Sequence, residues 1–226
     1  MIARIKKNGI VYDTVVFAFF TDGWKTKIIG FNETFQTLEY ISFYDKTHPY
    51  IHQQMIIIDG SEKEWIKNDK SKGYDWIVND TQLLKLIKKS RDIPDDILSR
   101  CLEMQENIHI PDWFEVTDKK SAENLLGAGG YFHDGNIEDI TVESGETVIA
   151  ISVWGGKVRF RLKEAELSDN CQIGYGSMGE IYDSNIFFED NRIFWTDSED
   201  VTCKDELYDD SCYFSASKML WNVELN

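Results

Sequence analysis

The residues best suited to chemistry lie in an acidic stretch from Thr196 to Cys212, "TDSEDVTCKDELYDDSC". Seven carboxylates surround a single lysine there, namely Asp197, Glu199, Asp200, Asp205, Glu206, Asp209 and Asp210. Such a stretch can form a cation site, a disordered spacer, a solvated loop or a surface for a basic partner. A standard calcium hand starting at Asp197 is excluded, because its fifth and sixth positions are Val201 and Thr202 where an oxygen ligand and a glycine are required. An irregular cation site and the other three alternatives stay open.

The second chemical candidate is the tetrapeptide "FHDG", Phe132 to Gly135. An adjacent His-Asp pair occurs in metal-dependent phosphohydrolases, but those enzymes need further His and Asp ligands. The second half of this chain has no histidine besides His133, so we predict no metal site and no cofactor. The simpler interpretation is a turn in which Asp134 and Gly135 bend the chain and His133 forms a local hydrogen bond.

Two further sequence motifs lack a feature that their function would require. "GYGSMG", Gly174 to Gly179, has the letters of a dinucleotide-binding loop, but the β-like "EIYDSNIFFED" follows it where a helix should begin. We predict a loop or an irregular edge strand there. The serine nucleophile motif G-x-S-x-G is missing at Ser177, because Tyr175 stands two residues before it. The sequence therefore predicts no catalytic residue.

Charge is divided unevenly along the 226 residues. Residues 1–111 carry 15 basic and 16 acidic side chains, net −1, whereas residues 112–226 carry 9 basic and 24 acidic ones, net −15. A nucleic-acid ligand is not expected, because phosphate contacts need clustered Lys and Arg. A membrane partner is not expected either, since the longest apolar run is Val15–Phe20.

The chain begins without the apolar segment of a secretory signal, which favours a cytoplasmic location. The four cysteines form no C-x-x-C pair, and in a cytoplasmic protein they are expected to be free thiols. Cys203 and Cys212, which flank the acidic stretch, are the one pair that the sequence suggests for a disulfide.

The helix and strand patterns along the chain predict an α+β protein, mostly antiparallel β-sheet, with a helical hairpin between two β-rich parts. Residues 1–111 contain short β-type runs, hairpin signals at Asp22-Gly23 and Asp59-Gly60, and then two amphipathic helices at about 81–90 and 94–104. Residues 112–226 begin with a short helix, about Asp118 to Leu126, that ends at glycines.

Two-residue turns then join successive strands, which predicts an antiparallel meander. The turns are Ser144-Gly145, Gly155-Gly156 and Asp190-Asn191, and the closing "YFSASKMLWNVEL" is long enough for one strand or a bent pair. In "KVRFRLK" the basic residues Lys157, Arg159, Arg161 and Lys163 alternate with apolar ones. We expect this basic stripe to pair with acidic neighbours across the sheet.

The motifs of the second half resemble a known module. "YFHDGNIEDITVESGETVIAISV", "KVRFRLKEAEL" and "FSASKMLWNVEL" are similar to a module of small bacterial cytosolic proteins in which an F/W-H-D-G/S tetrapeptide precedes an antiparallel sheet. The resemblance covers about Asp112 to Asn226. Some of these proteins resemble immunity proteins encoded beside secreted toxins. The resemblance marks His133, Asp134 and Gly135 as a family signature and implies no catalytic residue.

Together these observations favour a non-catalytic, immunity-like protein that docks a basic partner, such as a toxin, through its acidic C-terminal surface. The alternative is an enzyme or small-ligand-binding protein with a pocket near His133 and Trp154.

Overall fold

The computed structural model divides the chain into two compact units, Met1–Ile110 and Pro111–Asn226. The residues that it describes are 2–7, 10–22, 25–32, 37–44, 55–59, 66–67, 75–78, 99, 103, 111–153, 156–176 and 181–225. The predicted helical hairpin lies outside these residues, except for residues 99 and 103. The part of the chain that is described is mostly antiparallel β-sheet.

Unit 1 contains a seven-stranded sheet with the order β4-β3-β2-β1-β5, in which β7 pairs with β2 and β6 pairs with β7. Its strands are β1 Ile2–Lys7, β2 Ile10–Asp22, β3 Lys25–Asn32, β4 Thr37–Tyr44, β5 Met55–Asp59, β6 Ile66–Lys67 and β7 Asp75–Val78. The hairpin predicted at Asp22-Gly23 is confirmed, because Asp22 pairs with Lys25. The one at Asp59-Gly60 lies partly outside the described residues, in which β5 pairs with β1 and β6 with β7. A turn signal cannot show that a more distant strand offers the better partner.

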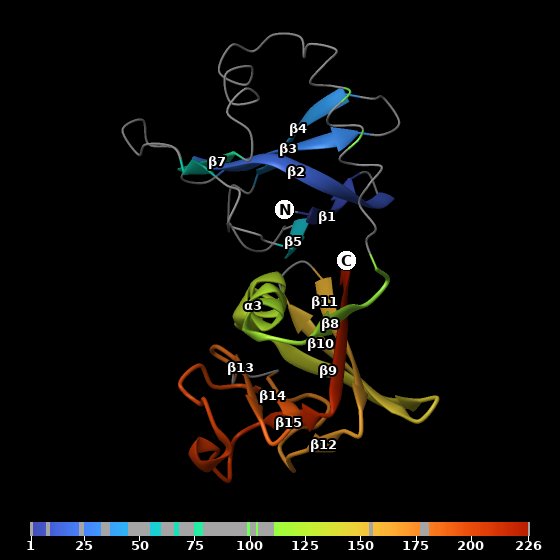
Figure 1. Ribbon diagram of the computed structural model, residues 1–226, viewed down its shortest axis with the longest axis vertical. Coiled ribbons are helices and arrows are strands. Elements are labelled where there is room, and N and C mark those ends of the chain that lie inside the picture. The colour runs from blue at the N-terminus through green and yellow to red at the C-terminus, as the bar shows by residue number, and fades with distance from the viewer. Residues whose placement is uncertain are drawn as a thin grey trace. The chain divides into compact units, whose positions relative to one another are not determined.

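Unit 2 contains two antiparallel sheets and a helix (Figure 1). The larger sheet has the order β8-β16-β11-β10-β9 and the smaller the order β12-β15-β14-β13. Their strands are β8 Phe114–Val116, β9 Asn136–Glu143, β10 Glu146–Val153, β11 Gly156–Lys163, β12 Glu166–Leu167, β13 Asn185–Glu189, β14 Arg192–Thr196, β15 Tyr213–Ala216 and β16 Lys218–Leu225. The predicted hairpins are present, but the turn expected at Gly155-Gly156 is misplaced by one residue, because Gly156 already pairs with Val153. The single meander is wrong, because the chain leaves the first sheet after β11 and returns to it as β16.

The helix α3, Lys119–Ala128, begins where its sequence supplies a cap. The carboxylate of Asp118 accepts a hydrogen bond from the backbone N–H of Ser121 at 2.8 Å, and the Ser121 hydroxyl oxygen accepts one from the N–H of Asp118 at 2.9 Å. This reciprocal pair satisfies two of the donors that a helix N-terminus leaves open. The helix ends at Ala128, two residues beyond the predicted end, and Gly129 is its C-cap.

An aromatic core joins the two sheets of unit 2. The ring of Phe160 from the larger sheet lies edge-on to Phe214 of the smaller one, with centroids 5.0 Å apart, and Trp195 stacks on Phe214 at 4.8 Å. Phe132 completes the group, 5.7 Å from Phe160 and 5.6 Å from Trp195. All four side chains are fully buried. Because apolar burial is the main stabilising contribution, this group fixes how the two sheets pack.

Three of the four residues of the basic stripe on β11 pair with acids of the same sheet, as predicted, whereas Lys163 stands opposite Lys218 in the register. Lys157 contacts Glu138 at 3.0 Å, and Arg159 lies between Glu143 and Glu224 at 3.6 and 3.2 Å. Arg161 contacts Glu146 at 3.7 Å and stacks over the Trp113 ring. These positive charges are therefore matched within the larger sheet.

No helix among the described residues is long and apolar enough to cross a membrane.

Candidate protein-binding surface

The acidic stretch forms a loop, residues 197–212, which we call the acidic loop. It leaves β14, includes the short 3-10 helix η4, Lys204–Glu206, and leads into β15. Its residue Val201 is buried against Phe187 and Phe194, whose rings stack at 4.8 Å, and Leu207 packs at the edge of the same group. The loop is thus an ordered cover on one face of the smaller sheet, and the disordered-spacer alternative is wrong.

Hydrogen bonds from neighbouring segments hold the loop backbone. The Asn185 side-chain amide donates to the carbonyl of Val201 at 2.9 Å, and that of Asn170 donates to the carbonyl of Asp209 at 3.0 Å. Near the far end, the N–H of Tyr208 donates to the Ser211 hydroxyl at 3.0 Å. Because two of these bonds join the loop to Asn185 and Asn170, they hold its backbone against the rest of unit 2.

Lys204 ties the loop to the turn between β13 and β14. Its ammonium lies 2.7 Å from the Asp190 carboxylate and 5.2 Å from the Phe194 ring centroid, and its backbone N–H donates to the Glu189 carboxylate at 2.8 Å. The hydrogen bond to Asp190 raises the pKa of Lys204. The lone lysine of the stretch is therefore occupied in holding the loop in place.

Asp197 differs from the other six carboxylates because it is half-buried. The hydroxyl of Tyr175 donates a hydrogen bond to it, and its own N–H donates to the carbonyl of Cys212 at 3.1 Å. Burial raises the pKa of Asp197, and this effect exceeds the opposing effect of the Tyr175 hydrogen bond. Its position favours a structural role at the loop base.

Glu206 is exposed but also occupied. Its carboxylate accepts hydrogen bonds from the N–H of Thr202 at 2.6 Å and from the Thr202 hydroxyl at 2.9 Å. These bonds lower the pKa of Glu206, because they favour the charged form. The side chain closes the first turn of the loop.

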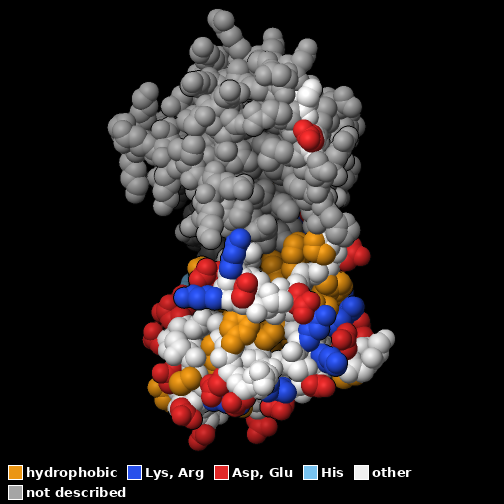
Figure 2. Space-filling model, in the orientation of Figure 1, with side chains coloured by type: hydrophobic (Ala, Val, Ile, Leu, Met, Phe, Trp, Pro, Cys, Tyr) orange, Lys and Arg blue, Asp and Glu red, His pale blue; other side chains and the backbone are white. Residues whose placement is uncertain are grey.

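Five carboxylates remain for contact with another molecule: Glu199, Asp200, Asp205, Asp209 and Asp210. All five are exposed, and no Lys, Arg or His in the described part of the chain forms an ion pair with them. Figure 2 shows acidic side chains gathered at the lower end of unit 2 in that view, where the loop lies. Among the described residues, no group of three or more His, Cys, Asp or Glu side chains is placed to hold a metal ion.

The loop ends at Cys212, whose nearest cysteine partner is not the one suggested by the sequence. Cys212 shares a hydrogen bond with buried Cys171, and this bond, together with burial, raises the pKa of Cys212. Cys171, Cys203 and Cys212 are free thiols, and Cys101 lies outside the described residues. The suggestion of a Cys203–Cys212 pair is wrong, because the β12–β15 register brings the segment after β12 beside Cys212.

The "FHDG" tetrapeptide lies at a second ordered site, which we call the turn junction: residues 130–135 with 174–176 and 181–184. The N–H of Asp134 donates to the carbonyl of Ile181 at 2.9 Å, and the Ser184 hydroxyl donates to the carbonyl of Tyr131 at 2.9 Å. The His133 N–H donates to the carbonyl of Gly130 at 3.3 Å, which is the predicted local hydrogen bond, while the His133 ring bonds to the distant carbonyl of Tyr182. The signature residues join two segments about fifty positions apart.

Glycines make the turn junction possible. Gly176 has a φ of 89°, and a side chain there would overlap the carbonyl oxygen of Gly135. A side chain at Gly135 would lie 2.6 Å from the carbonyl oxygen of Phe132. Glycine is therefore required by close backbone approach. The described part of "GYGSMG" is a turn, and Ser177 to Gly179 lie outside the described residues.

His133 and Asp134 are both exposed, and their side chains lie 4.0 Å apart. Trp154, the other member of the predicted pocket, lies outside the described residues. That pocket therefore stays a prediction. Comparison of the chain with models of protein families, with curated proteins and with solved structures found no match.

Proposed function

We propose that this chain is a non-catalytic binding protein whose acidic loop docks a basic protein. The observation that supports the proposal is that some charged side chains of the loop hold it in place while others remain exposed. Lys204, Glu206 and Asp197 are used to hold it, while five carboxylates are left exposed without a described cationic neighbour. Between Glu164 and Asp210 the chain has 14 acidic residues against Arg192 and Lys204, a net charge of −12.

The fixed loop suits electrostatic recognition for two reasons. Like charges held on an ordered backbone produce a directed negative potential, which raises the rate of encounter with a positive surface. Because the loop is already ordered, little conformational entropy is lost when it binds. The resemblance of the "FHDG" module to immunity proteins suggests a toxin as the basic partner, and nuclease toxins have positive clefts for phosphate. We place the complex in the cytoplasm, where the free thiols would persist.

The test compares two triple variants that each remove three carboxylates. The loop variant is Asp205→Asn, Asp209→Asn and Asp210→Asn, and it leaves the structural residues Asp197 and Glu206 in place. The control is Asp112→Asn, Glu123→Gln and Asp139→Asn, three exposed positions on other segments. Wild type and both variants are used to isolate partners from the native host, and each captured protein is purified for stopped-flow measurement.

We expect wild type and control to capture the same basic protein and the loop variant to associate with it about tenfold more slowly. The wild-type association rate should also fall as salt rises from about 0.05 to about 0.3 M, because the Debye length shortens. Equal association rates for wild type and loop variant at low salt would contradict the proposal.

A further inference from the structure

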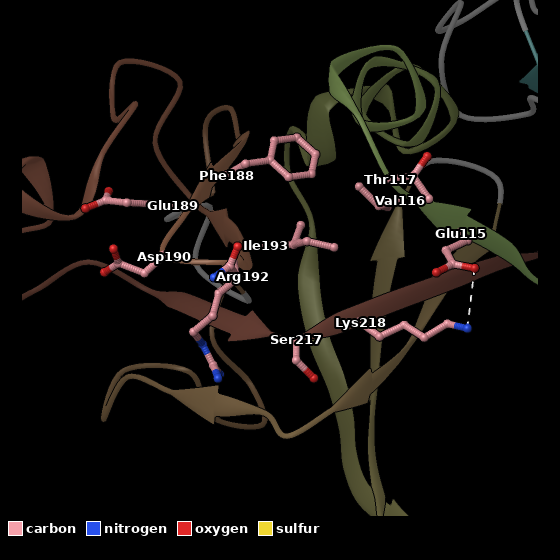
Figure 3. A pocket seen from close by; sticks show the side chains of 11 residues that line it. Glu115, Val116, Thr117, Phe188, Glu189, Asp190, Arg192, Ile193, Ser217 and Lys218 are labelled. Carbon is pink, nitrogen blue, oxygen red and sulfur yellow. Dashed lines mark ion pairs between the residues drawn. The ribbon is translucent and has the colours of Figure 1, made fainter.

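A trough of about 580 Å³ lies beside the acidic loop, between the two sheets of unit 2 (Figure 3). The β13–β14 hairpin forms one wall with Phe188 and Ile193, and the end of β8 forms the other with Val116 and Glu115. The junction of β15 and β16 lies between these walls, and α3 contacts both β8 and β13. Phe188 is 43% exposed although it is a large apolar side chain. Val116 and Ile193 are buried, and the lining also includes the charged residues Glu189, Asp190, Arg192 and Lys218, so the exposed apolar contact that the trough offers is Phe188.

The hairpin geometry leaves a backbone edge open beside this trough. Asp190 and Asn191 both have left-handed φ angles, 50° and 60°, as in the two-residue turn that closes a hydrogen-bonded pair. The closing pair is Glu189 with Arg192, so the N–H and C=O of the preceding residue, Phe188, point away from β14. Since β13 is an edge strand, these groups face no neighbouring strand, and no described residue bonds to them.

The outward N–H of Ile186 already has a hydrogen-bond acceptor, which limits the open edge to the hairpin end of β13. The N–H of Ile186 also points outward, but the side-chain oxygen of Asn185 accepts its hydrogen bond at 2.8 Å. The Asn185 amide meanwhile holds the carbonyl of Val201 in the acidic loop. Asn185 therefore both satisfies the outward N–H of Ile186 and anchors the acidic loop.

The two faces of the open edge carry opposite chemistry. Phe188 lies opposite Ile193 in the register, so both side chains lie on the face that reaches the trough. Phe187 and Glu189 lie on the other face, where the acidic loop packs and Lys204 bonds to Glu189 and Asp190. An added strand would show the same alternation, with every second side chain in the trough and the others beside the acidic loop.

We propose that the edge of β13 at Phe188 binds an extended segment of the basic partner in which apolar residues alternate with Lys or Arg. The apolar side chains enter the trough, where they pack mainly against Phe188. The cationic side chains lie on the loop face beside Glu189 and Asp190. Asp190 pairs with the Lys204 ammonium, whereas Glu189 accepts a hydrogen bond from the uncharged backbone N–H of Lys204. Strand addition of this kind draws affinity from main-chain hydrogen bonds and specificity from alternate side chains. The inference rests on the proposed function, since it names the part of the partner that follows the first electrostatic contact.

The experiment uses the full chain and a fluorescent, terminally blocked peptide, Arg-Val-Arg-Val-Arg-Val, measured by fluorescence anisotropy. One control peptide replaces each Arg with Glu, and another carries N-methyl groups on alternate backbone amides so that it cannot pair as a strand. The protein variants are Phe188→Ala and Phe188→Pro, the second of which also removes the outward N–H. Val142→Ala is the matched control, because Val142 is 73% exposed on the edge strand of the other sheet.

We expect the basic peptide to bind and both control peptides to bind at least about tenfold more weakly. Phe188→Ala and Phe188→Pro should each weaken binding by at least about fivefold, whereas Val142→Ala should change it less than twofold. Circular dichroism of each variant should match wild type. No binding at about 1 mM peptide, or equal binding of the N-methylated peptide, would overturn the proposal. So would dimerisation of the wild type that Phe188→Ala abolishes, because the occupant would then be a second copy.

Kinetics with the captured partner separate this proposal from the previous one. The loop variant should slow association, because it removes long-range attraction, while Phe188→Ala should speed dissociation by removing a packed contact. A wild-type dissociation rate for Phe188→Ala, together with slow association of the loop variant, would overturn the strand-addition proposal alone. The reverse result would overturn the acidic loop as the docking surface while leaving the β13 edge as a binding site.

Discussion

The acidic loop and the turn junction are both irregular segments fixed in unit 2, but they are fixed by different means. The acidic loop is held by side chains, with Val201 in an apolar cluster and Lys204 and Glu206 forming polar ties, so its remaining side chains are exposed. The turn junction is held by backbone groups at distances that only glycine permits. The acidic loop therefore presents side chains to solvent, whereas the turn junction joins distant parts of the fold.

The largest expected effect lies in the turn junction. Gly176→Ala should lower the free energy of unfolding by about 4 kcal/mol or more, because the new methyl group overlaps the carbonyl of Gly135 and the φ is left-handed. Gly174→Ala is a matched control, since its φ of 91° is similar but no atom lies within 4 Å of the added Cβ. It should cost only about 1–2 kcal/mol. Equal losses in urea unfolding would show that the backbones do not approach closely.

A smaller loss is expected where the acidic loop is anchored. Val201→Ala should lower the free energy of unfolding by about 2 kcal/mol, because it removes two methyl groups from the buried cluster with Phe187 and Phe194. It should also increase protease cleavage within residues 197–212. Val142→Ala, on an exposed position, should change stability by no more than about 0.5 kcal/mol. If the two variants were equally stable, the loop would not be held by Val201.

Two carboxylates of the loop should respond to pH in opposite directions. The pKa of Asp197 is raised above 3.8, so the folded state retains this proton longer than the unfolded state. As pH rises from about 3.8 through the folded pKa, wild type should lose stability relative to Asp197→Asn, and the difference should then stay constant. The asparagine side-chain oxygen can still accept the hydrogen bond from Tyr175.

Glu206 has the opposite sign, because its pKa is lowered below 4.5. Its contribution is fully present above pH 4.5 and is lost as pH falls through the folded pKa, whereas Glu206→Gln should lack that loss. Urea unfolding of wild type and both variants between about pH 3 and pH 7 measures the two slopes. The same sign for both variants would contradict the assignment of one carboxylate to a buried base and the other to a capped turn.

The smallest effect on stability is expected from the exposed carboxylates themselves. Asp205→Asn, Asp209→Asn and Asp210→Asn should each change the free energy of unfolding by no more than about 0.5 kcal/mol, because none has an ion pair among the described residues. Thermal unfolding of the triple variant checks this directly. A large loss would mean that these side chains support the fold, and the contrast between display and joining would fail.

Local rules let the sequence determine much of unit 2 by itself. Two-residue turns at Ser144-Gly145 and Asp190-Asn191 and the cap at Asp118 depend on residues within a few positions, and all three are present. The alternation in β11 was likewise sufficient to predict which side chains form the basic stripe. These features are short-range, so neighbouring residues specify them without knowledge of the rest of the chain.

The contacts between distant segments become visible in the folded structure alone. Nothing local marks Cys171 as the neighbour of Cys212, Tyr182 as the partner of His133 or Tyr175 as the donor to Asp197. The composition of the acidic stretch also could not distinguish the carboxylates that hold the loop from those that remain exposed, because all seven carry the same charged group. That difference comes from burial and from hydrogen bonds across the smaller sheet, which exist only after the two sheets pack around Phe132, Phe160, Trp195 and Phe214.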